Sequence, residues 1–246
     1  MSLNPLRNDS DQLEKLAIRL SAMGGLVEHQ LSSAISAFEK RDLSLARQII
    51  DGDKAVDDRE VEIEQMVINL LESRRLSGGN LRQAIMAMKA ANTLERVGDL
   101  AKNVAKRSLI TSQENAAETV ASIVRMGRIS LRQLHDVLNA VQERNPDIAV
   151  AVWGGDQEID ELFNSIFREI LTTMSRDPSR ISTGTHLAFV AKNFERIGDH
   201  ATNIAERLYY SMTGDQLDNK RPKTDITSMT VITGKSEELQ GEPQLS

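Results

Sequence analysis

The amino-acid sequence predicts an all-α protein made of two pseudo-symmetric antiparallel three-helix bundles in tandem. The first observation is a repeat: residues 94–107 read LERVGDLAKNVAKR, and residues 194–207 read FERIGDHATNIAER. So many identities in one register indicate two copies of one structural unit. The second is that apolar residues recur at three- and four-residue steps along most of the chain, which is typical of amphipathic helices. The third is that the loops between the helical segments are short, which makes neighbouring helices antiparallel.

Three helices are expected in the first half of the chain, at about residues 10–40, 43–74 and 81–109. The first has an apolar stripe that runs from Leu13 to Phe38, and candidate N-caps stand at its start, at Asp9, Ser10 and Asp11. A short break at Arg41-Asp42 separates it from the second helix. The second and third helices are separated by a turn at Ser77-Gly78-Gly79-Asn80.

Three more helices are expected in the second half, at about residues 113–142, 147–175 and 182–212. They are separated by Asn145-Pro146 and by Asp177-Pro178, since proline disfavours helix in the residue before it. From about Gly214 onward the periodicity is lost and polar residues dominate, which predicts a disordered tail. The expected domains are therefore residues 1–111, residues 112–213 and a tail at 214–246.

Composition excludes several classes of protein. The chain has 246 residues and no cysteine, which excludes disulfides and thiolate metal sites. Aromatic residues make up 3% and hydrophobic residues 40%, so the core must consist mainly of aliphatic side chains, which suits packed helices. The formal charge of −6 disfavours a nucleic-acid binder. No apolar run resembles a secretory signal or a membrane span, so a cytoplasmic protein without direct membrane insertion is expected.

Acidic pairs four residues apart occur on two helices of each half. The pairs are Asp53/Asp57 and Glu95/Asp99 in the first half, and Asp156/Asp160 and Glu195/Asp199 in the second. Residues four apart share one face of a helix. If each hairpin folds about its Gly or Pro turn, its two pairs come to the same height, about 30 Å from the turn at a rise of ~1.5 Å per residue. Two separately placed turns agree on this geometry.

Carboxylates gathered in this way repel one another, and a multivalent cation would offset the repulsion. Oxygen-rich sites favour magnesium, calcium, manganese or iron. A single acidic pair is usually a solvated helix face, but the repetition of the pattern favours a site. Asn103 and Asn203 extend the acidic stripe by one turn, and His200 lies beside Asp199, so these three are possible additional ligands.

The repeated phrases, together with the upstream acidic pairs, closely resemble the paired signature of the PhoU family of phosphate-transport accessory and regulatory proteins. The resemblance covers about residues 10–212. It implies two three-helix bundles, each with a metal cluster, often iron or zinc, held by its E(D)xxxD motifs. The expected ligands are the eight carboxylates of the four pairs. The expected ions are divalent or trivalent metal ions, with iron, zinc or magnesium as candidates.

The resemblance also implies a function. Proteins of the family restrain the phosphate-starvation response and phosphate uptake. They are thought to link the phosphate ABC transporter, through its PstB-like ATPase subunit, to a PhoR-like sensor histidine kinase. We therefore expect a metal-binding adaptor that is not an enzyme and that forms a homodimer.

The first copy of the signature departs from the second, since Leu100 and Lys102 stand where the second copy has His200 and Thr202. A lysine near the acidic cluster is expected to weaken its affinity for metal. Three alternatives compete with this interpretation. A di-iron oxidase needs a Glu three residues before a His, and no His here has one. A metal-dependent all-α nucleotide or phosphoester hydrolase would need Arg or Lys beside the metal, which Arg96 and Arg196 leave open. The third is a purely structural interaction bundle.

Overall fold

The computed structural model describes residues 5–73, 76–111, 117–155, 157–217 and 227, and all the regular structure of these residues is helical. The first half contains α1 (Pro5–Lys40), α2 (Leu43–Gly52), α3 (Lys54–Ser73) and α4 (Gly78–Thr111). The second half contains α5 (Ala117–Glu143), α6 (Pro146–Gly154), α7 (Gln157–Arg176), a short 3-10 helix η1 (Pro178–Arg180) and α8 (Ile181–Thr213). The predicted all-α class and the doubled bundle are confirmed.

Several helix ends lie where polar and glycine signals place them. Asp42 accepts a hydrogen bond from the Leu45 amide at 3.0 Å and begins α2. Asn145 does the same for α6, because its side chain accepts from the Asp147 amide at 3.0 Å. Gly214 caps the end of α8 (Ile181–Thr213), and its φ of +83° suits a residue without Cβ.

The start of the first helix differs from the expectation. Helix α1 begins at Pro5, so the candidate caps Asp9, Ser10 and Asp11 lie inside it. Proline suits the first position of a helix because its missing N–H has no partner there. The boundary at 112–116 and nearly all of the expected tail lie outside the described residues.

The second helix of each half is broken, whereas one continuous helix was expected in each. The first break lies at Asp53, between α2 and α3, and the second follows Gly154, between α6 and α7. Both breaks come directly after glycine, at Gly52 and at Gly154-Gly155. Glycine disfavours the helix interior by about 1 kcal/mol relative to alanine. Asp53 then starts α3, because its carbonyl accepts from the Val56 amide at 2.9 Å.

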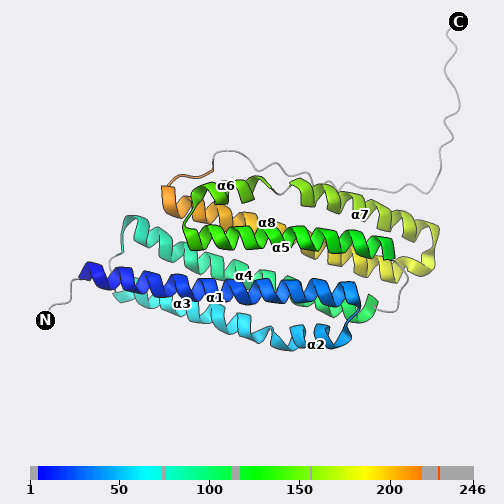
Figure 1. Ribbon diagram of the computed structural model, residues 1–246, viewed down its shortest axis with the longest axis horizontal. Coiled ribbons are helices and arrows are strands. Elements are labelled where there is room, and N and C mark those ends of the chain that lie inside the picture. Colours follow the sequence, from blue (N-terminus) through cyan, green and yellow to red (C-terminus); the bar gives the residue numbers. More distant parts are fainter. Residues whose placement is uncertain (1–4, 74–75, 112–116, 156, 218–226, 228–246) are drawn as a thin grey trace, which may run out of the picture.

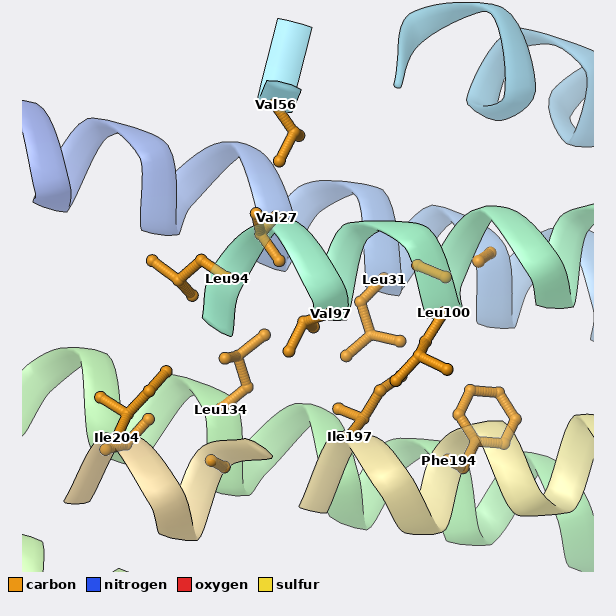
Figure 2. Close-up of a cluster of buried hydrophobic side chains, with 14 of the residues drawn as sticks. Val27, Leu31, Val56, Leu94, Val97, Leu100, Leu134, Phe194, Ile197 and Ile204 are labelled. Carbon is orange, nitrogen blue, oxygen red and sulfur yellow. The ribbon is translucent and has the colours of Figure 1, made fainter. Parts of the chain in front are cut away.

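The two halves pack side by side along their length (Figure 1). Contacts between them are made by α4 with α8 and by α1 with α5, while α2/α3 and α6/α7 cover the outer sides. The buried apolar side chains form one continuous core through both halves. Figure 2 shows its centre, where Val97 of α4 lies opposite Ile197 of α8, with Leu31 of α1 and Leu134 of α5 beside them.

Two glycines allow α1 and α5 to approach closely. A Cβ at Gly24 would lie 2.6 Å from a methyl group of Leu138, and a Cβ at Gly127 would lie 3.1 Å from Ile35 and 2.9 Å from the Phe194 ring. Each half therefore offers a glycine to a large side chain of the other half. The contact is reciprocal, as the pseudo-symmetry of the repeat requires.

Candidate functional site

The acidic pairs of the first half come together beside the break between α2 and α3. Asp53 is buried, with 5% of its surface exposed. The Nε2 of Gln30, on α1, donates to its Oδ1 at 2.8 Å, and the ammonium of Lys102, on α4, donates to its Oδ2. The same ammonium donates to Asp99 Oδ1 at 2.5 Å. Lys102 thus joins one carboxylate from each acidic pair.

The other two carboxylates lie on the outer side of this arrangement. Burial raises the pKa of Glu95, and the negative charges of Asp99, Asp57 and Glu60 raise it further. Asp57 itself is exposed. Helices α3 and α4 therefore bring their acidic residues within electrostatic reach of each other, at the common height that the hairpin geometry predicts.

Lys102 is held in its charged form by this environment. Burial alone would lower its pKa, but the hydrogen bonds and negative charges of Asp53 and Asp99 outweigh burial, so the pKa of Lys102 is raised above its usual range. Its side chain is 20% exposed and that of Asp53 is 7% exposed. The ammonium therefore supplies the positive charge that the sequence pattern assigns to a metal ion.

As arranged here, the first cluster does not fit a bound cation, because the Lys102 ammonium lies between the carboxylates of Asp53 and Asp99. In the part of the chain that the structure describes, no three His, Asp or Glu side chains are placed to hold one ion. Asp156, the remaining acid of the second half's pairs, lies outside the described residues.

The second half places its described acidic residues at the corresponding position. Asp160 on α7 is 2% exposed, Glu195 on α8 is 5% exposed, and Asp199 is half-buried. Here too a lysine is present, since Lys192 Nζ lies 2.9 Å from Glu195 Oε2 and 4.8 Å from the centre of the Phe163 ring. In each half, then, a lysine on the same helix as the repeated motif pairs with one of its acids.

Two buried glutamines support the helix breaks, and the sequence analysis did not identify them. Gln30 bonds Asp53 at the first break, and Gln133 Nε2 donates to the Gly155 carbonyl at 2.7 Å at the second. Each is 8% exposed. Gln30 precedes Asp53 by the same interval as Gln133 precedes Asp156, so the signal was present in the register of the repeat.

The glycine of the first repeated motif makes room for this support. A Cβ at Gly98 would lie 3.1 Å from Gln30 Oε1 and 3.3 Å from Val56. Contacts this short require the neighbours to move, so glycine allows α1 and α3 to approach α4 at the cluster. Of the possible additional ligands, Asn103 and Asn203 are half-buried on α4 and α8. His200 is half-buried too, and burial lowers its pKa to about 4, with the charges of Arg196, Arg96 and Arg207 contributing to the shift.

The fold and the site define a class of protein: a tandem of two helical bundles, each with an acidic cluster where its repeated motif faces a broken helix. The family model for the PhoU domain matches the chain twice, at residues 20–108 and 123–208. The chain therefore belongs to the PhoU family, and the resemblance inferred from the repeated phrases is confirmed.

Relatives agree along nearly the whole chain. The chain is 42% identical over 229 residues to the phosphate-specific transport system accessory protein PhoU homolog of Caulobacter vibrioides, covering 93% of this chain and 100% of that protein. It is 33% identical over 203 residues to the protein PhoU of Escherichia coli, covering 82% and 84%. The crystal structure of PhoU from Pseudomonas aeruginosa superposes with a TM-score of 0.81 at 31% identity, covering 84% of this chain and 99% of that one.

Proposed function

We propose that this chain is a cytoplasmic regulator of phosphate uptake that restrains the phosphate-starvation response. It would act as an adaptor between a PstB-like ATPase subunit of the phosphate ABC transporter and a PhoR-like sensor histidine kinase, and it would assemble as a homodimer. The observation that carries the proposal is the 42% identity across the full length of a relative named as an accessory protein of phosphate-specific transport. A solved relative from Streptococcus pneumoniae, 29% identical with a TM-score of 0.79, is named a regulatory protein of the same system.

An adaptor needs a surface rather than a reaction. It acts by binding one state of a partner more tightly than another, so its effect depends on differential affinity and not on turnover. The long outer faces of α2/α3 and α6/α7 are suited to such binding. None of the helices in the described part has an apolar window long enough to cross a bilayer.

Deleting the gene tests the proposal. In phosphate-rich medium the deletion strain should express its phosphate-starvation genes and take up phosphate as if starved, and the full chain supplied in trans should restore repression. A chain ending after Thr213 should restore it equally, because α8 is complete at that point. Normal phosphate-responsive expression in the deletion strain would contradict the proposal. Turnover of nucleotides or phosphate esters by the purified protein would favour a hydrolase instead.

Metal binding by the acidic clusters stays a prediction, and in the first cluster it requires Lys102 to leave its position between Asp53 and Asp99. The adaptor proposal rests on the relatives and not on metal. Elemental analysis of untagged protein purified without chelator tests it for both clusters. If both bind metal, changing Glu195 and Asp199 to Ala should roughly halve the content, whereas an unchanged content would contradict the assignment.

A further inference from the structure

Two hollows adjoin each other where α1 and α5 separate, at the junction of the two halves of the chain. The larger has a volume of about 670 Å³, and α1 and α5 form its sides. Figure 2 shows Leu94 of α4 and Ile204 of α8, two core residues that lie at its base. The smaller, of about 310 Å³, continues it toward the start of α4. The two hollows, together the α1/α5 groove, share Ala17, Leu20, Val141 and Arg144.

The repeat relates the two ends of the contact between α1 and α5. The same interval separates Gly24 from Gly127 and Arg41 from Arg144. Both arginines directly follow the first helix of their half and have a positive φ, 56° for Arg41 and 51° for Arg144. The interval therefore relates each residue of α1 to a counterpart in α5.

One end of this contact is bridged and the other is open. Arg128 of α5 donates to Glu39 of α1 at 2.8 Å, which joins the two helices by an ion pair. The counterparts of these residues at the other end are Gly25 and Gln142, and both line the groove. A Cβ at Gly25 would meet nothing within 4 Å. The groove is therefore open because a glycine stands where the opposite end has a bridging arginine.

The α1 side of the groove has a shape that suits a second copy of itself. Ile18 lines the groove and is 61% exposed, so a large apolar side chain projects beside the hollow. The next residues on this face, Ser21, Ala22 and Gly25, are small and exposed, which allows another helix to approach closely. A projection beside a hollow is self-complementary, because a two-fold axis brings the projection of each copy to the hollow of the other.

The two sides of the groove also carry opposite charges. Glu14 on α1 and Arg144 after α5 are both exposed, and both line the groove. Among the described residues, neither has an oppositely charged side chain within the 4.0 Å of an ion pair. The contacts of Gly24 and Gly127 fix the antiparallel register of α1 and α5, which places Arg144 level with Ile18, one helical turn from Glu14. A two-fold axis that crosses α1 between these levels brings Glu14 of each copy to Arg144 of the other.

We propose that the α1/α5 groove is the interface of a two-fold homodimer of this chain. The α1 helices of the two copies lie antiparallel, Ile18 of each copy fills part of the groove of the other, and Glu14 pairs with Arg144 twice. The inference rests on the proposed function for the homodimer and adds the surface that forms it. Apart from Arg144, the groove residues belong to α1, α4, α5 and α8, so the outer faces of α2/α3 and α6/α7 remain available to other partners.

Sedimentation velocity of the untagged full chain over a range of concentrations tests this interface. The wild type should sediment as a dimer. Gly25→Arg, which introduces the counterpart residue of α5, should weaken the dimer about tenfold or more, because the new side chain occupies the groove and meets open space within the monomer. Ala121→Arg is the matched control, because Ala121 is the exposed counterpart of Ile18 and lies at the far end of the α1/α5 contact. Its dissociation constant should stay within about twofold of the wild-type value.

Charge reversal tests the two-fold contact directly. Glu14→Arg and Arg144→Glu each place two pairs of like charges across the interface, so each variant alone should dimerise about tenfold more weakly or worse. In an equimolar mixture of the two variants, a mixed dimer regains both pairs of opposite charge. The mixture should therefore recover the dimer, and this recovery identifies a second copy of the chain as the occupant of the groove.

The outcomes separate this inference from the rest of the proposed function. A wild type that stays monomeric at every concentration would overturn both the groove interface and the homodimer, whereas the regulatory role is tested by the deletion strain. A dimer that Gly25→Arg leaves intact, in a variant with the wild-type circular dichroism, would overturn the interface alone. A mixture that associates no more than the single charge variants would do the same, since a two-fold contact requires both pairs to return.

Discussion

Replacing Lys102 by methionine tests whether the first acidic cluster depends on its own ammonium group. Methionine keeps much of the length of the lysine side chain and removes its charge. Asp53, which is 5% exposed, would keep only the Gln30 bond at 2.8 Å, while Asp99 is about half exposed and can be hydrated. Removing one partner of a buried ion pair costs about 3–5 kcal/mol. Because Gln30 remains and Lys102 is itself partly exposed, we expect a loss of about 2–3 kcal/mol.

Thermal unfolding followed by circular dichroism measures this loss. For a chain of this size the melting temperature should fall by roughly 5–10 °C. The raised pKa of Lys102 stabilises the fold at every pH below the ordinary lysine value, and this stabilisation is lost only as pH rises through the higher folded value. The difference between variant and wild type should therefore be constant between pH 6 and pH 9.

Two further variants serve as controls for Lys102→Met. Lys54→Met breaks an exposed ion pair with Asp58 on α3 and should leave the melting temperature unchanged within about 1 °C. In the Lys102→Met background, Asp53→Asn removes the stranded buried charge and should recover part of the loss. If Lys102→Met melts like the wild type, or if the double variant melts no higher than the single one, the ammonium is not the counter-charge of the cluster.

Three other variants test single features of the structure. His200 is neutral in the folded protein, so the free energy of unfolding of the wild type should decrease as pH falls from about 6.5 to the folded pKa of about 4. Relative to His200→Leu, the wild type should lose about 2 kcal/mol over this window, allowing for the partial exposure of the side chain. Parallel curves of stability against pH for the two proteins would contradict this. Gly127→Ala should destabilise by about 1–3 kcal/mol in urea unfolding, since the new Cβ would meet the Phe194 ring at 2.9 Å. Glu95→Gln should raise the melting temperature at pH 7, because the charged form of a carboxyl whose pKa is raised on folding destabilises the folded state. The gain should vanish below about pH 4, where the carboxyl is protonated in both the folded and the unfolded state.

The arrangement of helices was predictable from local signals. Asp42, Asn145 and Asp177 begin helical segments through side-chain bonds to nearby amides, which depend on a few neighbouring residues only. The common height of the acidic pairs in the first half was also predictable, because the turn of a hairpin fixes which residues of its two helices face each other.

The helix breaks and the interior of the site were harder to foresee. The apolar stripe continues through Ile49 and Val56, so periodicity alone gives no reason to end a helix at Gly52. Whether a Gly–Asp pair breaks a helix depends on a partner elsewhere, and that partner is Gln30, on another helix. The bond from Lys102 to both Asp53 and Asp99 is likewise tertiary. The sequence places Lys102 beside the cluster, but only the packing of α4 against the break shows that it takes the central position.

The reciprocal contact of Gly24 with Leu138 and of Gly127 with Ile35 has a consequence for how the chain folds. Each half leaves part of its apolar surface uncovered, and side chains of the other half complete the packing there. A polypeptide that ends after α4 would leave the inner faces of α1 and α4 in water, and apolar surface of that extent promotes association. We therefore expect separately made halves to be insoluble alone. When the two halves are mixed, they should recover a folded state, because each covers the apolar surface that the other exposes.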